Sequence, residues 1–224
     1  IGGNITMPHK KKVVEYLDDI SPDAKIIGSV NTIKIDENKK ITGYNTDGRG
    51  FVKALGENGV EFKGKKIVIA GAGGAARAVV TQLAFDGAGE IVLFNRTLSN
   101  AEEIIDNINK NIPTCKARAE EMNEAKLVEE MQDAAILVNC TSLGMKATVD
   151  QAIISSADQL PKGIFVADVV YDPDQTKLLK LAEEAGCKFM NGLMMMIWQG
   201  AIAFNIWTGK DMPVDLIKKE IFKK

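Results

Sequence analysis

The sequence predicts a protein of the α/β class, with a doubly wound parallel sheet in its larger part and the remainder of a smaller α/β unit before it. Two observations lead to this fold class. Strand-like and helix-like apolar patterns alternate through most of the chain, which is typical of parallel strands joined by right-handed crossovers. A glycine-rich turn also follows a short apolar strand and opens an alanine-rich helix. The 224 residues, 46% of them hydrophobic, are enough for a large core.

The alternating pattern places the elements of the larger part in order. Runs of apolar residues predict strands at 66–70, 90–94, 115–119, 134–139 and 163–170. Amphipathic or alanine-rich stretches predict helices at 75–86, 99–110, 124–131 and 175–185. The second of these helices opens on Ser99 with Glu102 three residues on, which indicates a capping box.

The two ends of the chain depart from this alternation. Residues 1–47 are expected to be the remainder of an N-terminal domain, with a helix from about Lys10, a helical turn after Ser21 and a hairpin of strands 32–35 and 41–44. Residues 48–191 are predicted to form the doubly wound domain. Residues 192–224 are predicted to be C-terminal helices that pack back on the small domain.

Composition excludes several classes of partner. A net charge of −2 provides no excess of cations for nucleic acid, and no apolar run approaches the length of a membrane span. The cysteines Cys115, Cys140 and Cys187 are odd in number and widely spaced, which fits neither a disulfide framework nor a zinc site. We therefore expect buried thiols, no metal, a cytoplasmic location and a small-molecule ligand.

The glycine-rich turn has the form G-x-G-x-x-[G/A] between a strand and a helix, the context that dinucleotide binding requires. Gly71 permits the tight turn, Gly73 lets the backbone approach a pyrophosphate, and Ala76 allows close helix–strand packing. The cofactor-binding residues expected here are Gly71, Gly73, Gly74, Ala75 and Ala76. We predict a Rossmann-like dinucleotide site; a glycine-rich turn that binds another ligand, or none, is the alternative.

The end of the second strand indicates which dinucleotide binds. NAD enzymes usually place an acid there for the ribose hydroxyl. This strand ends instead on Asn95, Arg96 and Thr97. Arg96 suits a 2′-phosphate and the other two suit neutral hydrogen bonds, which favours NADP. A solvated cation is the alternative for Arg96, and Arg77 is a candidate for a second phosphate contact.

Polar residues gather in the segments that lead into the doubly wound domain. Asn4 and Thr6 would point to one side of an extended segment, and Lys10 follows them. Asn31 begins a predicted strand, and Asp47 follows the hairpin. A polyhydroxylated substrate would need such groups.

These motifs resemble the shikimate dehydrogenase family over nearly the whole chain, and most closely its quinate/shikimate branch. The first matches are Asn-x-Thr-x-Pro-x-Lys at 4–10, Gly-x-Val-Asn-Thr at 28–32 and Gly-Tyr-Asn-Thr-Asp-Gly at 43–48. Later matches are Gly-Ala-Gly-Gly-Ala at 71–75, Asn-Arg-Thr at 95–97, Thr-Ser-Leu-Gly-Met at 141–145, Val-Tyr-Asp-Pro at 170–173 and the stretch 192–199.

The resemblance implies reversible hydride transfer between NADP, or alternatively NAD, and the C3 position of a cyclic hydroxy acid in the shikimate pathway of aromatic amino acid and chorismate biosynthesis. Lys10 and Asp47 would flank the reacting oxygen as the catalytic pair. The implied substrate-binding residues are Asn4, Thr6, Asn31, Tyr171 and Gln199. Thr141 and Gly192 would join the cofactor site, and the family contains monomers and homodimers.

Each of these residues also has a plain structural interpretation. Lys10 begins a run of three lysines that would otherwise be a solvated helix face, and Asp47 suits a helix cap. Asn31 suits a turn, and Gln199 lies in an apolar stretch typical of a helix core. We expect a surface or packing role for His9, the only histidine.

The chain departs from the family pattern in two places. Met194 stands where the family usually has a second glycine, which would alter how the nicotinamide docks. Family members also begin with a strand–helix segment, carrying hydroxyls for the substrate carboxylate, that precedes the equivalent of Ile1. We expect that a chain starting at Ile1 binds cofactor but turns over substrate poorly.

Three other functions remain open from the sequence alone. One is a quinate dehydrogenase that prefers NAD, and another is a non-catalytic cofactor-binding fragment. The third is an enzyme similar to methylenetetrahydrofolate dehydrogenase, against which the Asn-Thr-Asp-Gly element at 45–48 argues.

Overall fold

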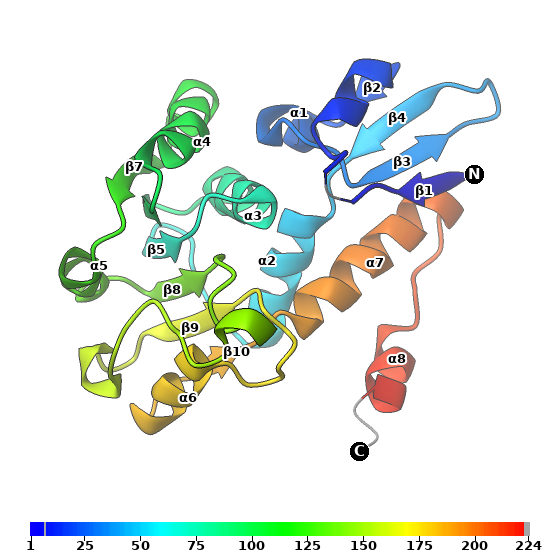
Figure 1. The fold of residues 1–224 in the computed structure, drawn as a ribbon. Coiled ribbons are helices and arrows are strands. Elements are labelled where there is room, and N and C mark those ends of the chain that lie inside the picture. Colours follow the sequence, from blue (N-terminus) through cyan, green and yellow to red (C-terminus); the bar gives the residue numbers. More distant parts are fainter. Residues whose placement is uncertain (7, 222–224) are drawn as a thin grey trace.

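The computed structural model describes residues 1–6 and 8–221, which form two sheets joined by long helices (Figure 1). The smaller sheet has four strands in the order β1-β3-β4-β2. Its strands are β1 (Gly2–Asn4), β2 (Asp19–Ile20), β3 (Thr32–Ile35) and β4 (Ile41–Tyr44). The hairpin of β3 and β4 is antiparallel and has the predicted bounds, because its polar loop separates two runs of β-branched residues.

The larger sheet is parallel throughout and has the order β10-β9-β8-β5-β6-β7. Its strands are β5 (Lys66–Ala70), β6 (Glu90–Asn95), β7 (Lys116–Glu121), β8 (Ile136–Asn139), β9 (Phe165–Asp168) and β10 (Phe189–Met190). Counted along the chain, this is the doubly wound order, with a switch point between β5 and β8. The α/β, Rossmann-like prediction is therefore confirmed, and ligands are expected at that switch point.

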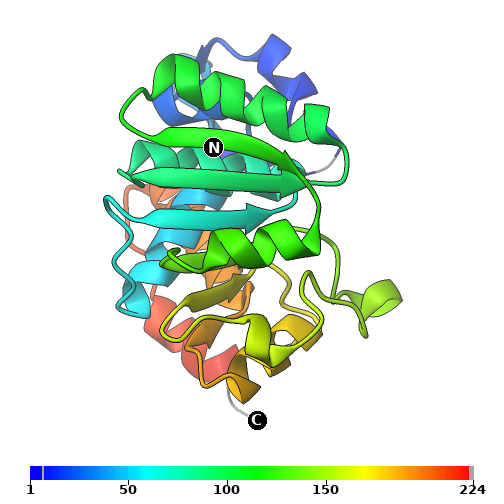
Figure 2. The same cartoon turned by 90° about the vertical axis from the view of Figure 1, so that its left-hand side faces the viewer.

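Helices cover both faces of the large sheet (Figure 2). On one face lie α2 (Asp47–Glu57), α3 (Gly74–Phe85) and α4 (Leu98–Asn111), and on the other α5 (Glu124–Met131) and α6 (Lys177–Glu184). Along β5 the side chains alternate between these cores: Ile67 and Ile69 pack towards α3, whereas Val68 packs towards the α5 and α6 side. The three cysteines are free and buried, as expected.

Two helices connect the sheets. α2 follows the hairpin directly, and α7 (Leu193–Thr208) runs beside it in the space between the sheets (Figure 1). The end of α7 reaches β3, where Trp207 Nε1 donates to the carbonyl of Ile33 at 2.9 Å. The remaining helices are α1 (Pro22–Ile27), α8 (Val214–Ile221) and three short 3-10 turns at Lys12–Tyr16, Lys146–Thr148 and Ala157–Gln159.

Within the described residues, no helix is long and apolar enough to cross a membrane. The two predicted domain boundaries, at 47/48 and 191/192, stay predictions.

Two local predictions were wrong. The helix expected from about Lys10 is a 3-10 helix over Lys12–Tyr16, since the β-branched Val13 and Val14 disfavour an α-helix and the chain must reach β2 within a few residues. The capping box at Ser99 does not form. The N-cap is Thr97, two residues earlier, and α4 begins at Leu98, because Asn95 Nδ2 donates to the carbonyl of Thr97 at 2.8 Å and fixes the turn there.

Candidate active site

A cavity of about 440 Å³ opens where the small sheet meets the carboxyl edge of the large one. All the predicted catalytic and substrate-binding residues line it: Lys10, Asp47, Asn4, Thr6, Asn31, Tyr171 and Gln199. Ala75 from the start of α3 and Gly192 from the start of α7 also line it. Segments far apart in the sequence therefore contribute to one polar hollow, which is the arrangement that a small polar ligand requires.

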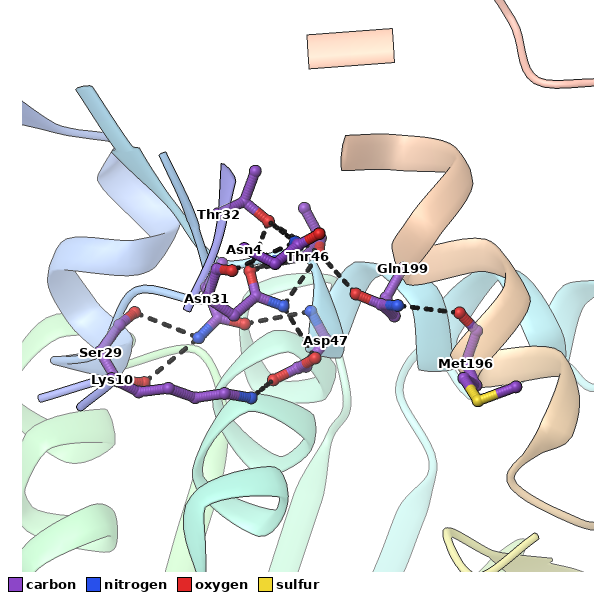
Figure 3. A network of polar contacts seen from close by, with 10 residues as sticks. Asn4, Lys10, Ser29, Asn31, Thr32, Thr46, Asp47, Met196 and Gln199 are labelled. Carbon is purple, nitrogen blue, oxygen red and sulfur yellow. Dashed lines mark hydrogen bonds and ion pairs between the residues drawn. The ribbon is translucent and has the colours of Figure 1, made fainter. Parts of the chain in front are cut away.

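The centre of this cavity is an ion pair between Lys10 and Asp47 (Figure 3). Lys10 Nζ donates to Asp47 Oδ2 at 2.6 Å, and the two side chains are 20% and 12% exposed. Asp47 is the first residue of α2, where a negative charge is stabilised by the helix dipole. The ammonium is therefore held in place while part of it remains open to a ligand.

Asn31 fixes the other oxygen of Asp47. Its Nδ2 donates to Asp47 Oδ1 at 2.8 Å and to Thr46 Oγ1 at 2.9 Å, while its Oδ1 accepts from the backbone N–H of Thr46 at 2.9 Å. Thr32 Oγ1 donates to the same Oδ1 at 2.9 Å. Because the amide is buried and its donors are both used within the protein, Asn31 acts here as the residue that orients the Asp47 carboxylate.

Thr46 is a site residue that the sequence analysis missed. It is fully buried, and its Oγ1 donates to Gln199 Oε1 at 3.4 Å, which connects the start of α2 to α7 (Figure 3). The signal was present, since Thr46 lies between two residues of the quoted motif. Gln199 in turn donates through Nε2 to the carbonyl of Met196 at 3.0 Å.

The remaining substrate candidates lie at the rim of the cavity. Asn4 Nδ2 donates to Thr32 Oγ1 at 3.2 Å and to the carbonyl of Asn31 at 3.3 Å. Thr6 is exposed, and Tyr171 is 49% exposed. These groups are therefore accessible to a ligand that enters from solvent.

The glycine turn after β5 fits a dinucleotide. Gly71 has a φ of 104°, and a Cβ on it would lie 2.7 Å from the backbone of Cys140, so only glycine suits this turn. A Cβ on Gly73 would meet no atom within 4 Å, which leaves open space in front of the turn. Among the described side chains, none caps the start of α3 at Gly74, so its first N–H groups are available to an anion.

The end of β6 presents the three residues predicted for the adenosine end. Asn95 Oδ1 accepts from the backbone N–H of Ala72 at 3.1 Å and so ties β6 to the glycine turn. Thr97 and Arg96 are exposed, and no ion pair involves Arg96 among the residues that the structure describes. Arg96 is thus a free cation beside the turn, as a 2′-phosphate contact requires.

Arg77 does not suit the role of second phosphate contact. Its guanidinium is only 10% exposed and is paired with Glu103 of α4 at 2.8 Å. Gly192 precedes α7, and a Cβ on it would lie 2.0 Å from the carbonyl oxygen of Val169. The cavity wall therefore needs glycine at this position.

Thr141 lies in a loop held by side chains at the ends of two strands. Its Oγ1 donates to Asn139 Oδ1 at 2.7 Å and accepts from the backbone N–H of Leu143 at 3.1 Å. Asn139 Nδ2 donates to Asp168 Oδ1 at 2.9 Å. The sequence analysis missed Asn139 and Asp168, although polar residues ending two adjacent parallel strands were a visible signal.

Comparison with known families gives three matches that together extend over most of the chain. Residues 1–33 match the shikimate dehydrogenase substrate binding domain, and residues 54–173 match the shikimate / quinate 5-dehydrogenase family. Residues 192–222 match the shikimate 5'-dehydrogenase C-terminal domain.

Individual relatives agree. The chain is 52% identical over 223 residues to the shikimate dehydrogenase (NADP(+)) of Alkaliphilus metalliredigens, covering 100% of this chain and 78% of that protein. It is 45% identical, with a TM-score of 0.95, to a crystal structure of shikimate 5-dehydrogenase from Listeria monocytogenes in complex with shikimate and NAD, covering 99% of this chain and 77% of that one. A quinate/shikimate dehydrogenase of Shigella flexneri is 38% identical and covers 97% of this chain and 88% of that protein. The protein belongs to the shikimate dehydrogenase family.

Proposed function

We propose that the protein catalyses the NADP-dependent, reversible reduction of 3-dehydroshikimate to shikimate, a step of aromatic amino acid biosynthesis. Its membership of a family of nicotinamide-dependent oxidoreductases supports this function, as do relatives named for the same activity. The observation that carries the proposal is the Lys10–Asp47 pair in a polar cavity that also reaches the start of α3 beside the glycine turn.

The pair supplies the proton chemistry. NADP, when bound, supplies the hydride acceptor for shikimate oxidation. In the direction of reduction, the Lys10 ammonium gives a proton from Nζ to the new hydroxyl oxygen and is left as a neutral amine, which takes a proton back from water. In the direction of oxidation, Nζ first loses a proton to water, and the neutral amine then removes the proton from the reacting hydroxyl. Asp47 holds Nζ at 2.6 Å and keeps it directed at the ligand. A preorganised ammonium at this point also stabilises the negative charge that develops on the oxygen.

The other polar residues orient the ring. Asn4, Thr6 and Gln199 face the cavity and are proposed to bind ring hydroxyls, with Tyr171 lining the outer wall. The amide of Asn31 is committed to Asp47 and Thr46, so we assign it the placement of the carboxylate in addition to any ring contact.

The choice of NADP rests on Arg96. It is an exposed cation, without an ion-pair partner in residues 1–6 and 8–221, where an NAD enzyme usually has an acid. NAD is the alternative cofactor, and quinate is the alternative substrate in view of the 38% identical quinate/shikimate relative. We further propose a cytoplasmic location, on the basis of three buried thiols, and either a monomer or a homodimer.

The test is an initial-rate assay that follows NADPH or NADH formation with shikimate and with quinate. Lys10→Met removes the ammonium and keeps the length of the side chain, and Lys11→Met is the control on the adjacent, exposed lysine. We expect shikimate with NADP to give the highest rate, a kcat about 10²–10⁴-fold lower in Lys10→Met, and little change in the control. Equal rates in both variants would refute the assigned role of Lys10. NADPH binding without turnover of either substrate by the wild type would favour the cofactor-binding fragment.

A further inference from the structure

Asp168 is a buried acid that the hydride-transfer chemistry above does not use. It ends β9, and its residue is 0% exposed. Its partner in register is Asn139, the last residue of β8, which is in turn paired with Ala70, the last residue before the glycine turn. Asp168 therefore lies at the carboxyl edge of the sheet, two strands from the cofactor turn, where ligands of this fold bind.

The carboxylate accepts hydrogen bonds from three segments. Oδ1 accepts from Asn139 Nδ2 at 2.9 Å and from the backbone N–H of Val170 at 3.0 Å, and Oδ2 accepts from Thr176 Oγ1 at 2.7 Å. All three partners donate, which matches the acceptor-only character of an ionised carboxylate. Within the part of the chain that the structure describes, no charged side chain contributes to the pKa shift of this carboxyl group. The titratable group that senses its charge is the thiol of Cys140, which follows β8.

The bond to Asn139 fixes which way that amide faces. Since Nδ2 is held by Asp168, Oδ1 must face the loop, where it accepts from Thr141 Oγ1 at 2.7 Å and from the backbone N–H of Thr141 at 3.1 Å. Thr141 Oγ1 then accepts from the N–H of Leu143. An ordered chain of hydrogen bonds thus runs from Asp168 to the loop that begins at Thr141.

The other two bonds hold the facing wall. Val170 immediately precedes Tyr171, and Val169 and Tyr171 both line the cavity. Thr176 caps the start of α6 and packs against the same loop, because a Cβ on Gly144 would lie 2.9 Å from Thr176 Cβ. The Asp168 carboxylate is therefore bonded directly to Val170, next to the cavity wall. Through the side chains of Asn139 and Thr176 it is also connected to the Thr141–Gly144 loop.

We propose that Asp168 is a positioning residue for hydride transfer, acting through Asn139 on the Thr141–Gly144 loop and through Val170 on the Tyr171 wall. The role rests on the proposed function, since it concerns the placement of the nicotinamide against the substrate carbon. Burial raises the pKa of Asp168 to about 6, while the three donors favour the charged form, so the carboxyl group is ionised at neutral pH.

The experiment compares Asp168→Asn with Thr176→Val in the complete protein. The asparagine keeps the shape but lets the Asn139 amide turn over, whereas the valine removes the bond to Oδ2 and leaves Asn139 held. Initial rates are measured with shikimate deuterated at the carbon that gives the hydride, and NADPH binding is measured by fluorescence. For Asp168→Asn we expect kcat/KM for NADP to fall about 10- to 100-fold and the isotope effect on kcat to rise. Thr176→Val removes one of the three bonds to the carboxylate but leaves Asn139 held, so we expect a smaller fall in kcat/KM than in Asp168→Asn and an unchanged isotope effect.

A purely structural role gives a different result. It would reduce the folded fraction, so kcat would fall while KM and the isotope effect stayed at wild-type values, and this outcome would overturn the proposal. The double variant Asp168→Asn with Asn139→Ala should lose no more kcat/KM for NADP than the more impaired single variant, because both residues act through the same chain of hydrogen bonds. Additive losses would also contradict the proposal. Absence of turnover in the wild type would reject the proposed function. In that case NADPH binding still tests the positioning role, and unaltered binding in Asp168→Asn would reject it.

Discussion

At the scale of single residues, the site depends on buried polar groups whose hydrogen bonds are completed inside the protein. Asn31 holds Asp47, and Asp47 holds Lys10, so the reactive ammonium is placed by residues from three separate segments. Such networks are rigid when every member is satisfied and costly when one is removed. The proposed catalytic lysine is 20% exposed on the cavity, whereas Asp47 and Asn31, which hold it, are buried residues.

The charge of Asp168 should appear in the pH dependence of stability. Burial raises its pKa from 3.8 to about 6, so the folded state binds this proton more tightly than the unfolded state. The contribution is fully present below about pH 4 and is lost as the pH rises through about 6, and this loss is on the order of 3 kcal/mol. Urea unfolding between pH 4 and 8 should show the wild type losing that much stability relative to Asp168→Asn. Parallel curves for the two proteins would show that the group does not titrate as described.

At the scale of elements, the glycine turn needs glycine for two reasons. Gly71 adopts a backbone conformation that other residues avoid, whereas Gly73 leaves space for a ligand, and substitutions can separate the two effects. Gly71→Ala should lower the free energy of unfolding by about 1–3 kcal/mol, because φ is 104° and the new Cβ meets the backbone after β8. Gly73→Ala should fold with stability within about 0.5 kcal/mol of wild type, since φ is −79° and no atom lies within 4 Å. It should nevertheless weaken NADPH binding at least about 10-fold, because its methyl group occupies the pyrophosphate approach. Chemical unfolding and fluorescence titration check both; normal NADPH binding by Gly73→Ala would place the pyrophosphate elsewhere.

Elements with a strong local pattern were predictable from the sequence. The strand Lys66–Ala70, the hairpin and the helix Glu124–Met131 have the expected bounds, because apolar periodicity alone decides them. The strands β1, β2 and β10 were missed. They are two or three residues long and exist only through pairing with distant partners, which no local pattern reveals.

The site divides in the same way. Residues within contiguous motifs, such as Lys10 and Asp47, were predicted and do line one cavity. Thr46 lies within such a motif and Asp168 lies in a predicted strand, but neither was singled out, because their roles depend on contacts with α7 and with the end of β8. The role of Asn31 as the residue that orients Asp47 likewise needed the fold.

At the scale of the whole molecule, α2 and α7 hold the two sheets in one arrangement. A Cβ on Gly50 would lie 2.7 Å from the backbone nitrogen of Gln199 and 2.8 Å from the carbonyl oxygen of Met195. These helices can therefore lie this close only where α2 has glycine. The seam between them also carries the bond from Thr46 to Gln199.

Gly50→Ala should push α7 away from α2 and displace Gln199. We expect a loss of about 1–3 kcal/mol in the free energy of unfolding, as overpacking typically causes, together with a raised KM for shikimate. Gly56→Ala is the matched control on the same helix, where a Cβ meets nothing within 4 Å; it should be neutral or gain up to about 1 kcal/mol. Chemical unfolding and substrate kinetics of both variants check this, and an unchanged KM in Gly50→Ala would mean that Gln199 does not depend on the seam.

The close contact of α2 with α3 determines how accurately Asp47 is placed relative to the glycine turn. Asp47 begins α2, Gly74 begins α3, and a Cβ on Gly48 would lie 2.4 Å from the carbonyl oxygen of Ala78. Asp47 and the glycine turn therefore lie at the starts of two helices whose backbones are in direct contact. They are not carried by two domains joined through a linker. The position of Asp47 relative to the cofactor turn is therefore set by one helix–helix contact.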